Sequence, residues 1–307
     1  MTAPSPRPLA DVAAGFGAVR RDAVFDRTGF AGDGGARILC CAAGGRYLKR
    51  ALAQPDTAAV ITTPDLADQV PEPLGLLVAD DPEIAFWRLH NRLALDHGMR
   101  VSVESAVDPS AEIHPAALVA PGCRIGAGVR IGAGAIIEAG TVLAEGVHVG
   151  AGVRIGCEGL FVRRRPGLIL RVEHAGGVEI GPDAVILPGA MIQRDVRPEF
   201  TRIGARSVIA NRASISHGTR IGDDATVAGG AIICGHAVIG DGVWIGPGAV
   251  VRDRAEIGAA ARVEIGAVVG GSVGPGERVS GVFAGPHRQM VRLWAKLKDG
   301  EGAAPPT

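Results

Sequence analysis

Residues 203–233 read IGARSVIANRASISHGTRIGDDATVAGGAII, and an isoleucine or valine stands at every sixth position of this stretch. A helix repeats its buried positions about every 3.6 residues and an amphipathic strand every two, so neither accounts for a strict period of six. A short period of this kind is typical of a β-solenoid, whose stacked coils bury one aliphatic residue per short strand. The stretch therefore predicts a solenoid.

The six-residue period extends over about half of the chain, with two interruptions. A first run extends from Val107 to Ile155, a short run from Ile180 to Ile192, and a long run from Ile203 to Val269. Three hexads make one three-sided coil of 18 residues, so the 24 aliphatic positions of these runs predict about eight coils. We assign residues 104–275 to this solenoid.

Residues 1–103 lack the hexad pattern and predict a small α/β domain. The expected helices are near Leu9–Phe16, from Arg46 to about Leu52 and from Glu83 to about His97, and the expected strands are Ala36–Cys41, Ala58–Thr62 and Leu74–Val78.

Residues 276–307 form a tail that contains an amphipathic stretch after Pro286. Arg288, Arg292 and Lys296 recur there at helical spacing and predict a helix with one basic side. That side is either a binding surface or simply a solvated face.

Composition excludes several classes of protein. The formal net charge is zero, which argues against non-specific nucleic-acid binding through a charged surface. No 18-residue apolar run occurs, so we expect no membrane span. The N-terminus MTAPSPRPLADVA has neither a basic start nor an apolar stretch and does not resemble a signal peptide. The five cysteines are odd in number and lack metal spacing, and together these features predict a cytoplasmic protein with reduced thiols.

Two insertions interrupt the repeat. The first lies between residues 155 and 180 and contains Arg163-Arg164-Arg165, and the second, Gln193–Thr201, lengthens one step of the repeat from six residues to eleven. Loops that leave a rigid scaffold often carry binding groups. The alternative is that both are neutral surface insertions.

Two of the eight histidines, His217 and His236, lie in the longest run just after an insertion. His217 is two residues past the inward Ile215, so its imidazole should protrude outward, and with a pKa near 6.5 it suits a general base. Gly235 lies one coil of 18 residues later, where its N–H is open to a carbonyl oxygen, as an oxyanion donor must be. A separation of about 5 Å between base and donor suits acyl transfer. The plain alternative is a histidine that only decorates the surface.

A metal site fits these residues poorly. His236 lies 19 residues after His217 and is therefore out of register with it, and Glu199 stands one coil before His217. Three histidines do not meet on neighbouring coils, as a zinc site of this kind requires. A cysteine nucleophile has little support, because Cys234 adjoins an inward position and has no evident base.

Several stretches match a known family. They are Thr201–Gly222 around His217, Ile155-Gly-Cys-Glu-Gly159 and Gly177-Val-Glu-Ile-Gly181 on either side of the first insertion, and Ala284-Gly-Pro286 before the last helix. With these residues the chain resembles, over nearly its whole length, the UDP-3-O-acylglucosamine N-acyltransferases of lipid A biosynthesis, which move a hydroxyacyl chain from acyl carrier protein to an amino sugar. The resemblance implies a left-handed parallel β-helix of hexapeptide repeats, a homotrimer with active sites between subunits, and an N-terminal uridine-binding domain.

The resemblance also implies roles for individual residues. His217 corresponds to the family's catalytic histidine, Gly235 to the glycine whose N–H polarises the thioester carbonyl, and Asn211 to a substrate-binding asparagine of the motif. The uridine-binding positions fall on Cys41, Gly44 and Tyr47. The donor would be the phosphopantetheine thioester of acyl carrier protein, docked by the basic side of the last helix, and no further cofactor or metal is implied.

The chain departs from the family at several of these positions. Ala210 replaces an aspartate that would orient the base, Gly218 replaces an asparagine, and Gln193-Arg194-Asp195 replaces Asp-Arg-Gly. Cys41 stands where an aromatic stacks on uracil, and Gly44 where an asparagine contacts it. The fold and acyl transfer withstand these changes, but the exact sugar nucleotide does not follow from them.

Three hypotheses result. The first is an N-acyltransferase that uses acyl carrier protein as donor and a UDP-3-O-acylglucosamine-type sugar as acceptor. The second is an acyltransferase of the same fold that uses another amino sugar or an acyl-CoA. The third is a non-catalytic solenoid that binds nucleotide sugars, and the spacing of His217 and Gly235 argues against it.

Overall fold

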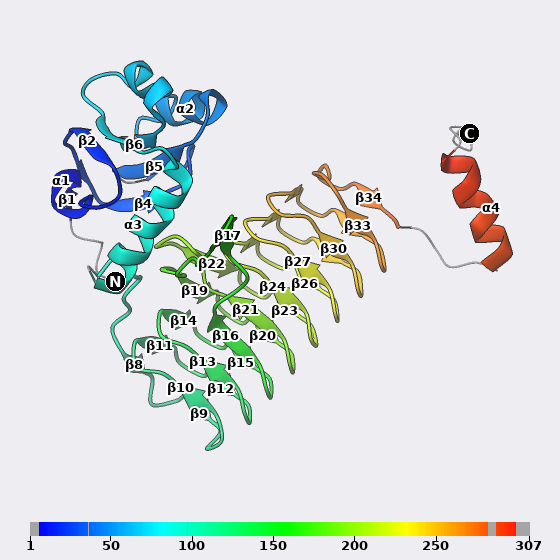
Figure 1. Ribbon diagram of the computed structural model, residues 1–307. Coiled ribbons are helices and arrows are strands. Elements are labelled where there is room, and N and C mark those ends of the chain that lie inside the picture. The colour runs from blue at the N-terminus through cyan, green and yellow to red at the C-terminus, as the bar shows by residue number, and fades with distance from the viewer. Residues whose placement is uncertain (1–5, 36, 97, 282–286, 299–307) are drawn as a thin grey trace.

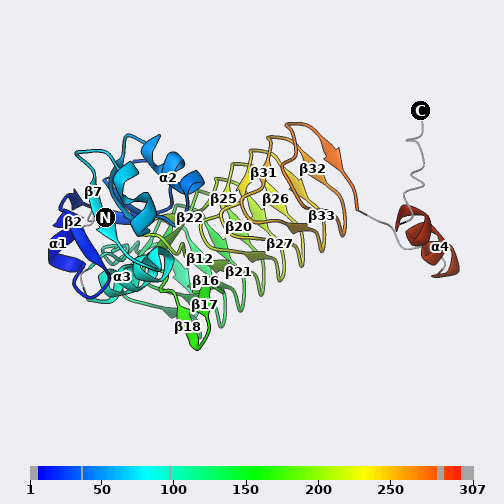
Figure 2. The ribbon, with the colours of Figure 1, turned by 45° about the horizontal axis from the view of Figure 1, so that its top comes forward.

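The computed structural model describes residues 6–35, 37–96, 98–281 and 287–298. A small N-terminal domain lies against a long three-sided prism of stacked coils, and helix α4 (His287–Lys298) lies beyond the last coil (Figures 1 and 2). None of the helices in these residues has the length and apolar character needed to span a bilayer.

The N-terminal domain is a five-stranded sheet covered on both faces. The strand order is β2-β7-β6-β5-β4, in which β4 to β7 run parallel and β2 is antiparallel to β7. Along β5, Leu39 packs with the helix α3 side of the sheet, whereas Ile38 and Cys40 pack with the helix α2 side, as the alternation of a strand requires. The strands are β1 (Arg7–Pro8), β2 (Ala18–Arg21), β3 (Val24–Phe25), β4 (Arg27–Gly29), β5 (Ile38–Ala42), β6 (Thr57–Thr62) and β7 (Gly75–Val78). The helices are α1 (Leu9–Val12), α2 (Gly45–Leu52), the 3-10 helix η1 (Pro64–Gln69) and α3 (Pro82–Asp96).

The expected elements of this domain are present with one notable difference in length. Helix α1 ends at Val12 instead of Phe16. The chain turns through Gly15 at φ 88°, a left-handed conformation that stops a helix and that glycine adopts without strain. The short strands β1 to β4 and helix η1 were not expected.

The solenoid consists of three parallel sheets, which form the faces of the prism. The first face contains β8 (Ala106–Val107), β11 (Cys123–Ile125), β14 (Thr141–Leu143), β19 (Gly177–Ile180), β22 (Phe200–Ile203), β25 (Arg220–Ile221), β28 (Val238–Ile239) and β31 (Glu256–Ile257). The second face contains β9 (Glu112–Ile113), β12 (Arg130–Ile131), β15 (His148–Val149), β20 (Val185–Ile186), β23 (Val208–Ile209), β26 (Thr226–Val227), β29 (Trp244–Ile245), β32 (Arg262–Val263) and β34 (Arg278–Val279). The third face contains β10 (Leu118–Val119), β13 (Ile136–Ile137), β16 (Arg154–Cys157), β21 (Met191–Gln193), β24 (Ser214–Ile215), β27 (Ile232–Ile233), β30 (Val250–Val251) and β33 (Val268–Val269).

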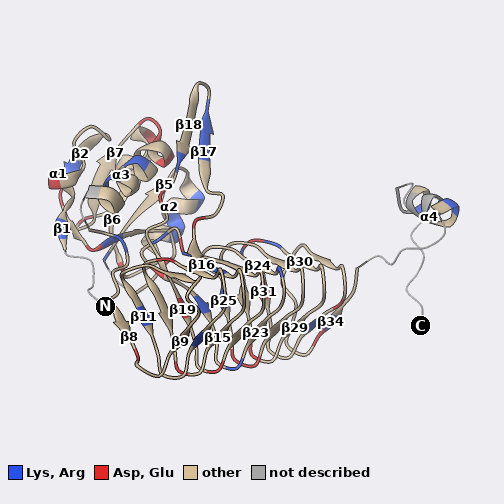
Figure 3. Cartoon of the chain, turned by 90° about the horizontal axis from the view of Figure 1, so that it is seen from below, with Lys and Arg blue, Asp and Glu red and all other residues tan. Residues whose placement is uncertain are grey.

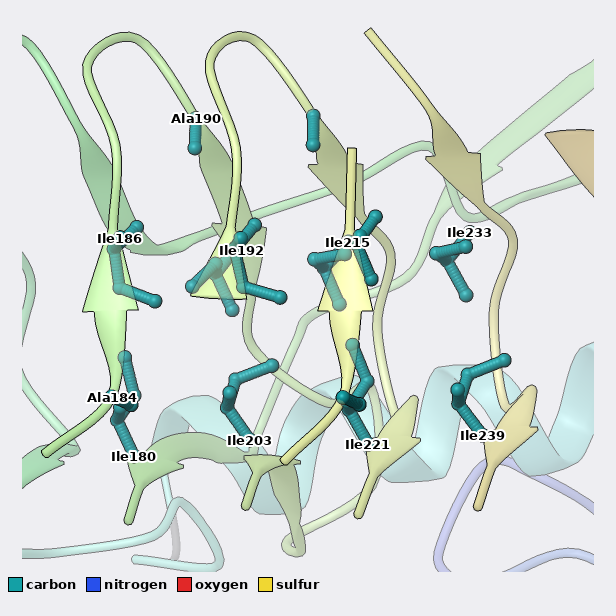
Figure 4. Packing of buried hydrophobic residues seen from close by; sticks show 14 of the residues in the cluster. Ile180, Ala184, Ile186, Ala190, Ile192, Ile203, Ile215, Ile221, Ile233 and Ile239 are labelled. Atoms are coloured by element: carbon teal, nitrogen blue, oxygen red, sulfur yellow. The ribbon is translucent and has the colours of Figure 1, made fainter. Parts of the chain in front are cut away.

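The predicted left-handed parallel β-helix of hexapeptide repeats is confirmed. Apart from the first coil, each short strand of the three faces turns an aliphatic side chain into the prism, and Ile186, Ile192 and Ile215 have no exposed surface (Figure 4). A smaller buried residue often precedes the aliphatic one by two positions, as Ala184 precedes Ile186 and Ala190 precedes Ile192. The last strand, β34, lies just beyond the expected boundary at residue 275.

Both insertions leave the same edge of the prism, which we call the docking edge: the corner of each coil that joins the third face to the first. The first insertion connects β16 to β19 and contains the antiparallel hairpin of β17 (Val162–Arg165) and β18 (Leu168–Arg171), and the second connects β21 to β22. His217, His236 and Arg254 follow strands β24, β27 and β30 of the third face. They therefore stand at the same edge on three successive coils.

The N-terminal domain packs against the docking edge through a shared hydrophobic core. Val172, Ala175 and Val196 of the insertions belong to the same buried cluster as Trp87 and Leu89 of α3. Two insertions that the sequence marked only as interruptions therefore complete the core of another domain.

Polar contacts join the same parts. His90 of α3 is fully buried, and its Nε2 lies 2.9 Å from the carbonyl oxygen of Glu173. Arg27 pairs with Glu199 of the second insertion at 2.8 Å. The hairpin stands beside the N-terminal domain (Figure 3), where Arg165 pairs with Asp81 at 2.7 Å.

Candidate functional site

Gly235 lies directly beside His217, as the 18-residue coil predicts. A Cβ atom on Gly235 would be 2.5 Å from Nε2 of His217, a distance that real side chains do not tolerate. Among the described residues, no acceptor takes a hydrogen bond from the N–H of Gly235. A ring nitrogen and an unengaged backbone donor thus stand together on neighbouring coils.

His217 points away from the prism, but it does not protrude into solvent as expected. Phe161 and His174 of the first insertion cover it edge-on, with ring centroids 5.3 Å and 5.7 Å from its own. Nδ1 of His217 is buried and has no partner in the part of the chain that the structure describes. Burial lowers the pKa of His217 below its ordinary value of 6.5. The imidazole is therefore neutral at pH 7 and is a weaker base than a free histidine.

His236 joins this cluster even though it is out of register with His217. The two ring centroids are 5.1 Å apart. His236 stands one coil after Gly218, and a Cβ on Gly218 would overlap the His236 ring and lie 3.0 Å from Oδ2 of Asp195. Gly218, at φ 67°, thus leaves the space in which His236 and Asp195 meet.

Asp195 and Arg197 of the second insertion lie behind His236, and sequence reasoning did not assign them a role. Asp195 has no exposed surface, and its Oδ2 pairs with Nη2 of Arg197 at 2.8 Å. The same Nη2 lies 3.4 Å from Nδ1 of His236, whose pKa burial lowers to about 4. The only signal in the sequence was their position in the insertion just before the coil of His217.

The histidine cluster does not form a metal centre. No group of three or more His, Cys, Asp or Glu in the described residues is arranged to hold a metal ion. Nε2 of His174, for example, accepts a hydrogen bond from the N–H of Gly159 at 3.2 Å.

A pocket of about 280 Å³ opens between the N-terminal domain and the docking edge. Two of the residues predicted to bind substrate, Cys41 and Tyr47, line it. They lie at the carboxyl end of β5 and in the first turn of α2, where ligands of open α/β sheets bind. Gly44 is the N-cap of α2 and lies between them in sequence without lining the pocket.

Three arginines from different parts of the chain also line this pocket: Arg50 of α2, Arg163 of the hairpin and Arg254 of the coil after His236. Burial raises the pKa of the Cys41 thiol to about 12, so the thiol is neutral. Glu83 also lines the pocket and pairs with Arg163 at 2.5 Å, so the lining keeps an excess of positive charge from Arg50 and Arg254. Together with the exposed Tyr47 and the neutral Cys41 thiol, this set suits an anionic ligand with a planar or sugar moiety.

Aromatic side chains link the pocket to the histidines. Phe30 lines the pocket, and its ring centroid is 5.1 Å from that of His236. Trp87, on the same wall, is 5.0 Å from Phe161, which covers His217. A ligand in the pocket would therefore lie next to the walls of the histidine cluster.

Asn211 lies elsewhere in the chain. It is exposed at the corner between β23 of the second face and β24 of the third, whereas His217 lies at the opposite end of β24. Ala210 shares the corner of Asn211. An aspartate at position 210 would therefore not orient His217 of the same chain, contrary to the role we expected for it.

Arg288, Arg292 and Lys296 are exposed on α4, as expected for a basic row. The helix lies beyond the last coil and away from the docking edge (Figure 1). Within one chain, the structure does not bring these cations to the His217 cluster.

Residues 236–271 match the family model described as bacterial transferase hexapeptide (six repeats). The matched stretch begins directly after Gly235, so the chain carries the hexapeptide repeat of bacterial transferases in the coils that follow the candidate site. No match was found among curated proteins.

Several solved structures match this chain over part of its length. The UDP-N-acetylglucosamine acyltransferase from Campylobacter jejuni is 20% identical with a TM-score of 0.48, over 63% of this chain and 83% of that one. The Arabidopsis UDP-N-acetylglucosamine acyltransferase is also 20% identical, with a TM-score of 0.41 over 63% of this chain and 80% of that one. The acetyltransferase domain of PglB from Neisseria gonorrhoeae is 18% identical, with a TM-score of 0.24 over 81% of this chain and 98% of that one.

Proposed function

We propose that this chain is an acyltransferase that moves a (hydroxy)acyl chain from acyl carrier protein to the amine of a UDP-3-O-acylglucosamine-type sugar, as in lipid A biosynthesis. The observation that carries the proposal is the pairing of Nε2 of His217 with the unengaged N–H of Gly235. The match of residues 236–271 to bacterial transferase hexapeptides supports group transfer as the reaction class.

The pairing supports a two-step reaction. The amine nitrogen attacks the thioester carbonyl carbon, Nε2 of His217 takes the proton that the amine loses, and the Gly235 N–H donates to the oxyanion. When the tetrahedral intermediate collapses, the C–S bond breaks and the imidazolium gives its proton to the departing sulfur. The products are an amide and a free phosphopantetheine thiol, and the base is restored without any further cofactor.

The pocket beside the docking edge supports a nucleotide-sugar acceptor. The exposed Tyr47 ring offers a stacking surface for a base or sugar, and Arg50 and Arg254 offer charge for a diphosphate. The amino sugar would then extend from Arg254 towards the coil of His217.

A homotrimer would bring Asn211 into this scheme. The outward side chains of the third face are mostly apolar, and Leu118, Ile232 and Val268 are 64%, 43% and 77% exposed. This face lies between the corner that carries Asn211 and the docking edge. Packing of a second copy against it would place Asn211 of one chain near His217 of its neighbour, as sites between subunits require.

The basic row of α4 gives the scheme a donor-docking surface. Arg288, Arg292 and Lys296 are exposed, and acyl carrier proteins are acidic, so charge complementarity would speed their encounter. We place the reaction in the cytoplasm, where that donor is found.

A second acyltransfer is supported by one observation. Cys41 lines the pocket where the resembling family has an aromatic side chain, so the base of the nucleotide loses a stacking partner. Another amino sugar, or an acyl-CoA as donor, is therefore the alternative. A solenoid that binds nucleotide sugars without reacting is the outcome that would refute both.

Replacement of His217 by Ala tests the base. Transfer of the acyl chain should fall at least about hundredfold while circular dichroism and assembly stay unchanged, because the amine proton loses its acceptor. Replacement of Gly235 by Ala should cause a similar loss, because the new Cβ displaces the His217 ring and crowds the oxyanion position. Gly270 is the matched control, because it follows strand β33 directly and a Cβ added there would meet no atom within 4 Å. Gly270→Ala should therefore retain full activity. Full activity of His217→Ala would refute the assignment.

The partners need separate measurements on the full chain. Calorimetric titration should detect UDP binding, and Arg254→Ala should weaken that binding. The absence of a binding signal with the wild type would refute a uridine nucleotide as the ligand. Charge reversal of the α4 row should raise the KM for acyl carrier protein about tenfold. Equal activity with acyl-CoA, untouched by the reversal, would favour the alternative donor.

A further inference from the structure

The docking edge carries one buried carboxylate in the neighbourhood of the candidate base. Asp195 has no exposed surface, and it reaches this position because the second insertion folds back over the coil of His217. Burial alone would raise the pKa of the Asp195 carboxyl, but the charge and hydrogen bonds of Arg197 lower it below its ordinary value. Asp195 is therefore ionised at neutral pH.

Arg197 does not cancel this charge, because it is shared. Its Nη2 pairs with Asp195 at 2.8 Å and its Nη1 pairs with Asp33 of the N-terminal domain at 2.9 Å. One cation between two carboxylates leaves one net negative charge. Arg197 also lies over the ring of Phe30, 5.4 Å from its centroid, which fixes the guanidinium in place.

His236 separates this charge from His217 and is itself fixed. Nη2 of Arg197 is a donor, so the ring nitrogen that it faces, Nδ1 of His236, acts as the acceptor and the proton of the neutral ring lies on Nε2. Because burial lowers the pKa of His236 to about 4, the ring carries no charge at neutral pH. The His236 ring therefore packs against His217 without repelling the imidazolium that forms there.

Gly218 makes this arrangement possible. Any side chain at this position would overlap His236 and approach Asp195. Gly218, His236 and Asp195 therefore depend on one another for their packing.

We propose that Asp195 is a positioning residue for His217: its carboxylate, held by Arg197 behind the neutral His236 ring, stabilises the imidazolium that His217 becomes when it takes the proton of the amine. The role rests on the proposed function. It assigns the carboxylate beside the base to the second insertion of the same chain.

Other charged and titratable groups face the two histidines and must be distinguished from Asp195. Arg197 lowers the pKa of His217 and so opposes Asp195. Asp253, one coil beyond Gly235, raises the pKa of His217, but its side chain is 66% exposed. Arg254 acts on His236 from the next coil, and the neutral His174 faces His217 from the first insertion. Water screens Asp253, whereas the protein encloses Asp195.

The test is the titration of His217 in the full chain, followed by NMR through its ring Cε1–H signal. Asp195→Asn, which keeps the size of the side chain and removes its charge, should lower the pKa of His217 by about one unit or more. The pH at which kcat/KM rises should fall in parallel, with a plateau about tenfold lower. Asp253→Asn is the matched control, with the same change of charge at an exposed site, and should shift the pKa much less. Asp195→Glu restores the charge and should restore most of the wild-type pKa.

A pKa of His217 that is the same in wild type and a folded Asp195→Asn variant would overturn the proposal. If that variant does not fold, the wild type alone decides: a buried partner predicts a His217 pKa that stays constant from 0.05 to 1 M NaCl, and a pKa that changes with salt would assign the effect to surface charges. The titration needs no substrate. A His217→Ala variant that keeps full activity would therefore refute the proposed function without touching the Asp195–His217 coupling, so the two failures are distinguishable.

Discussion

The coils and the insertions of this protein solve opposite problems. In the coils, a side chain's position follows from its place in the hexad, so Ile215 is buried and His217 is at the docking edge for the same reason. In the insertions no period applies, and each residue is placed by what it contacts, as Asp195 is by Arg197 and Val172 by the N-terminal core. The comparison teaches that the repeat supplies the scaffold and the reacting pair, while the irregular segments supply their surroundings.

The largest expected difference between the coils and the insertions is in the free energy of unfolding that a core substitution removes. Replacement of Ile215 by Ala removes a fully buried side chain from a core that cannot close over the gap, and should lower the free energy of unfolding by about 3–4 kcal/mol. Ile169 on the hairpin is 64% exposed, and Ile169→Ala should change it by less than about 0.5 kcal/mol. Urea denaturation measures both. Equal losses would mean that the hairpin belongs to the cooperative core.

The second largest difference between the coils and the insertions should be in how their stability depends on pH. His90, at the contact between α3 and the first insertion, is fully buried, and burial lowers its pKa from 6.5 to about 4. Between these pH values the unfolded chain binds a proton that the folded protein does not, so stability falls as the pH decreases from about 6.5 to about 4. A pKa difference of this size corresponds to about 3 kcal/mol.

Thermal unfolding from pH 7 to pH 4 measures this effect. His90→Gln should flatten the fall in Tm, and His148→Gln, at an exposed position on the outside of a regular coil, should leave it unchanged. An unaltered slope in the His90 variant would show that its ring titrates alike in both states.

The smallest difference between the coils and the insertions should be in the stability that their ion pairs contribute. Glu199 of the second insertion pairs with Arg27, whose side chain is only 6% exposed, so Glu199→Gln leaves a buried cation without its counter-charge and should cost about 1–3 kcal/mol. Glu179 on a regular coil pairs with Arg202 at an exposed site, 41% and 46% accessible, and Glu179→Gln should change stability by less than about 0.5 kcal/mol. Similar values for both variants would place the second insertion among surface loops.

The sequence predicts the periodic half of the molecule well, because a period of six determines both burial and stacking. It assigns Gly235 to the coil position beside His217, and the succession of strands and helices in residues 1–103 is enough to predict a small α/β domain. Helix α1 was predicted too long because the left-handed turn at Gly15 interrupts the helix that the apolar residues of 9–16 indicate.

The surroundings of His217 could not be predicted in the same way. His174, Asp195 and Phe30 come from three segments whose approach depends on tertiary packing, and no spacing relates them to residue 217. The protruding base expected from the hexad is therefore half-buried, and its pKa is lowered accordingly. His236 and His217 are indeed one position out of register on neighbouring coils, as the 18-residue spacing predicts. Their ring centroids nevertheless lie 5.1 Å apart, because side chains one position apart at the same corner can still touch.

The shared core of the N-terminal domain has a consequence for how the chain matures. During synthesis, residues 1–103 leave the ribosome well before Val172, Ala175 and Val196, which complete their hydrophobic cluster, have been made. The N-terminal domain must therefore wait, with an apolar surface uncovered, for coils that are translated later. Its final packing reports that the solenoid has formed at least as far as the second insertion.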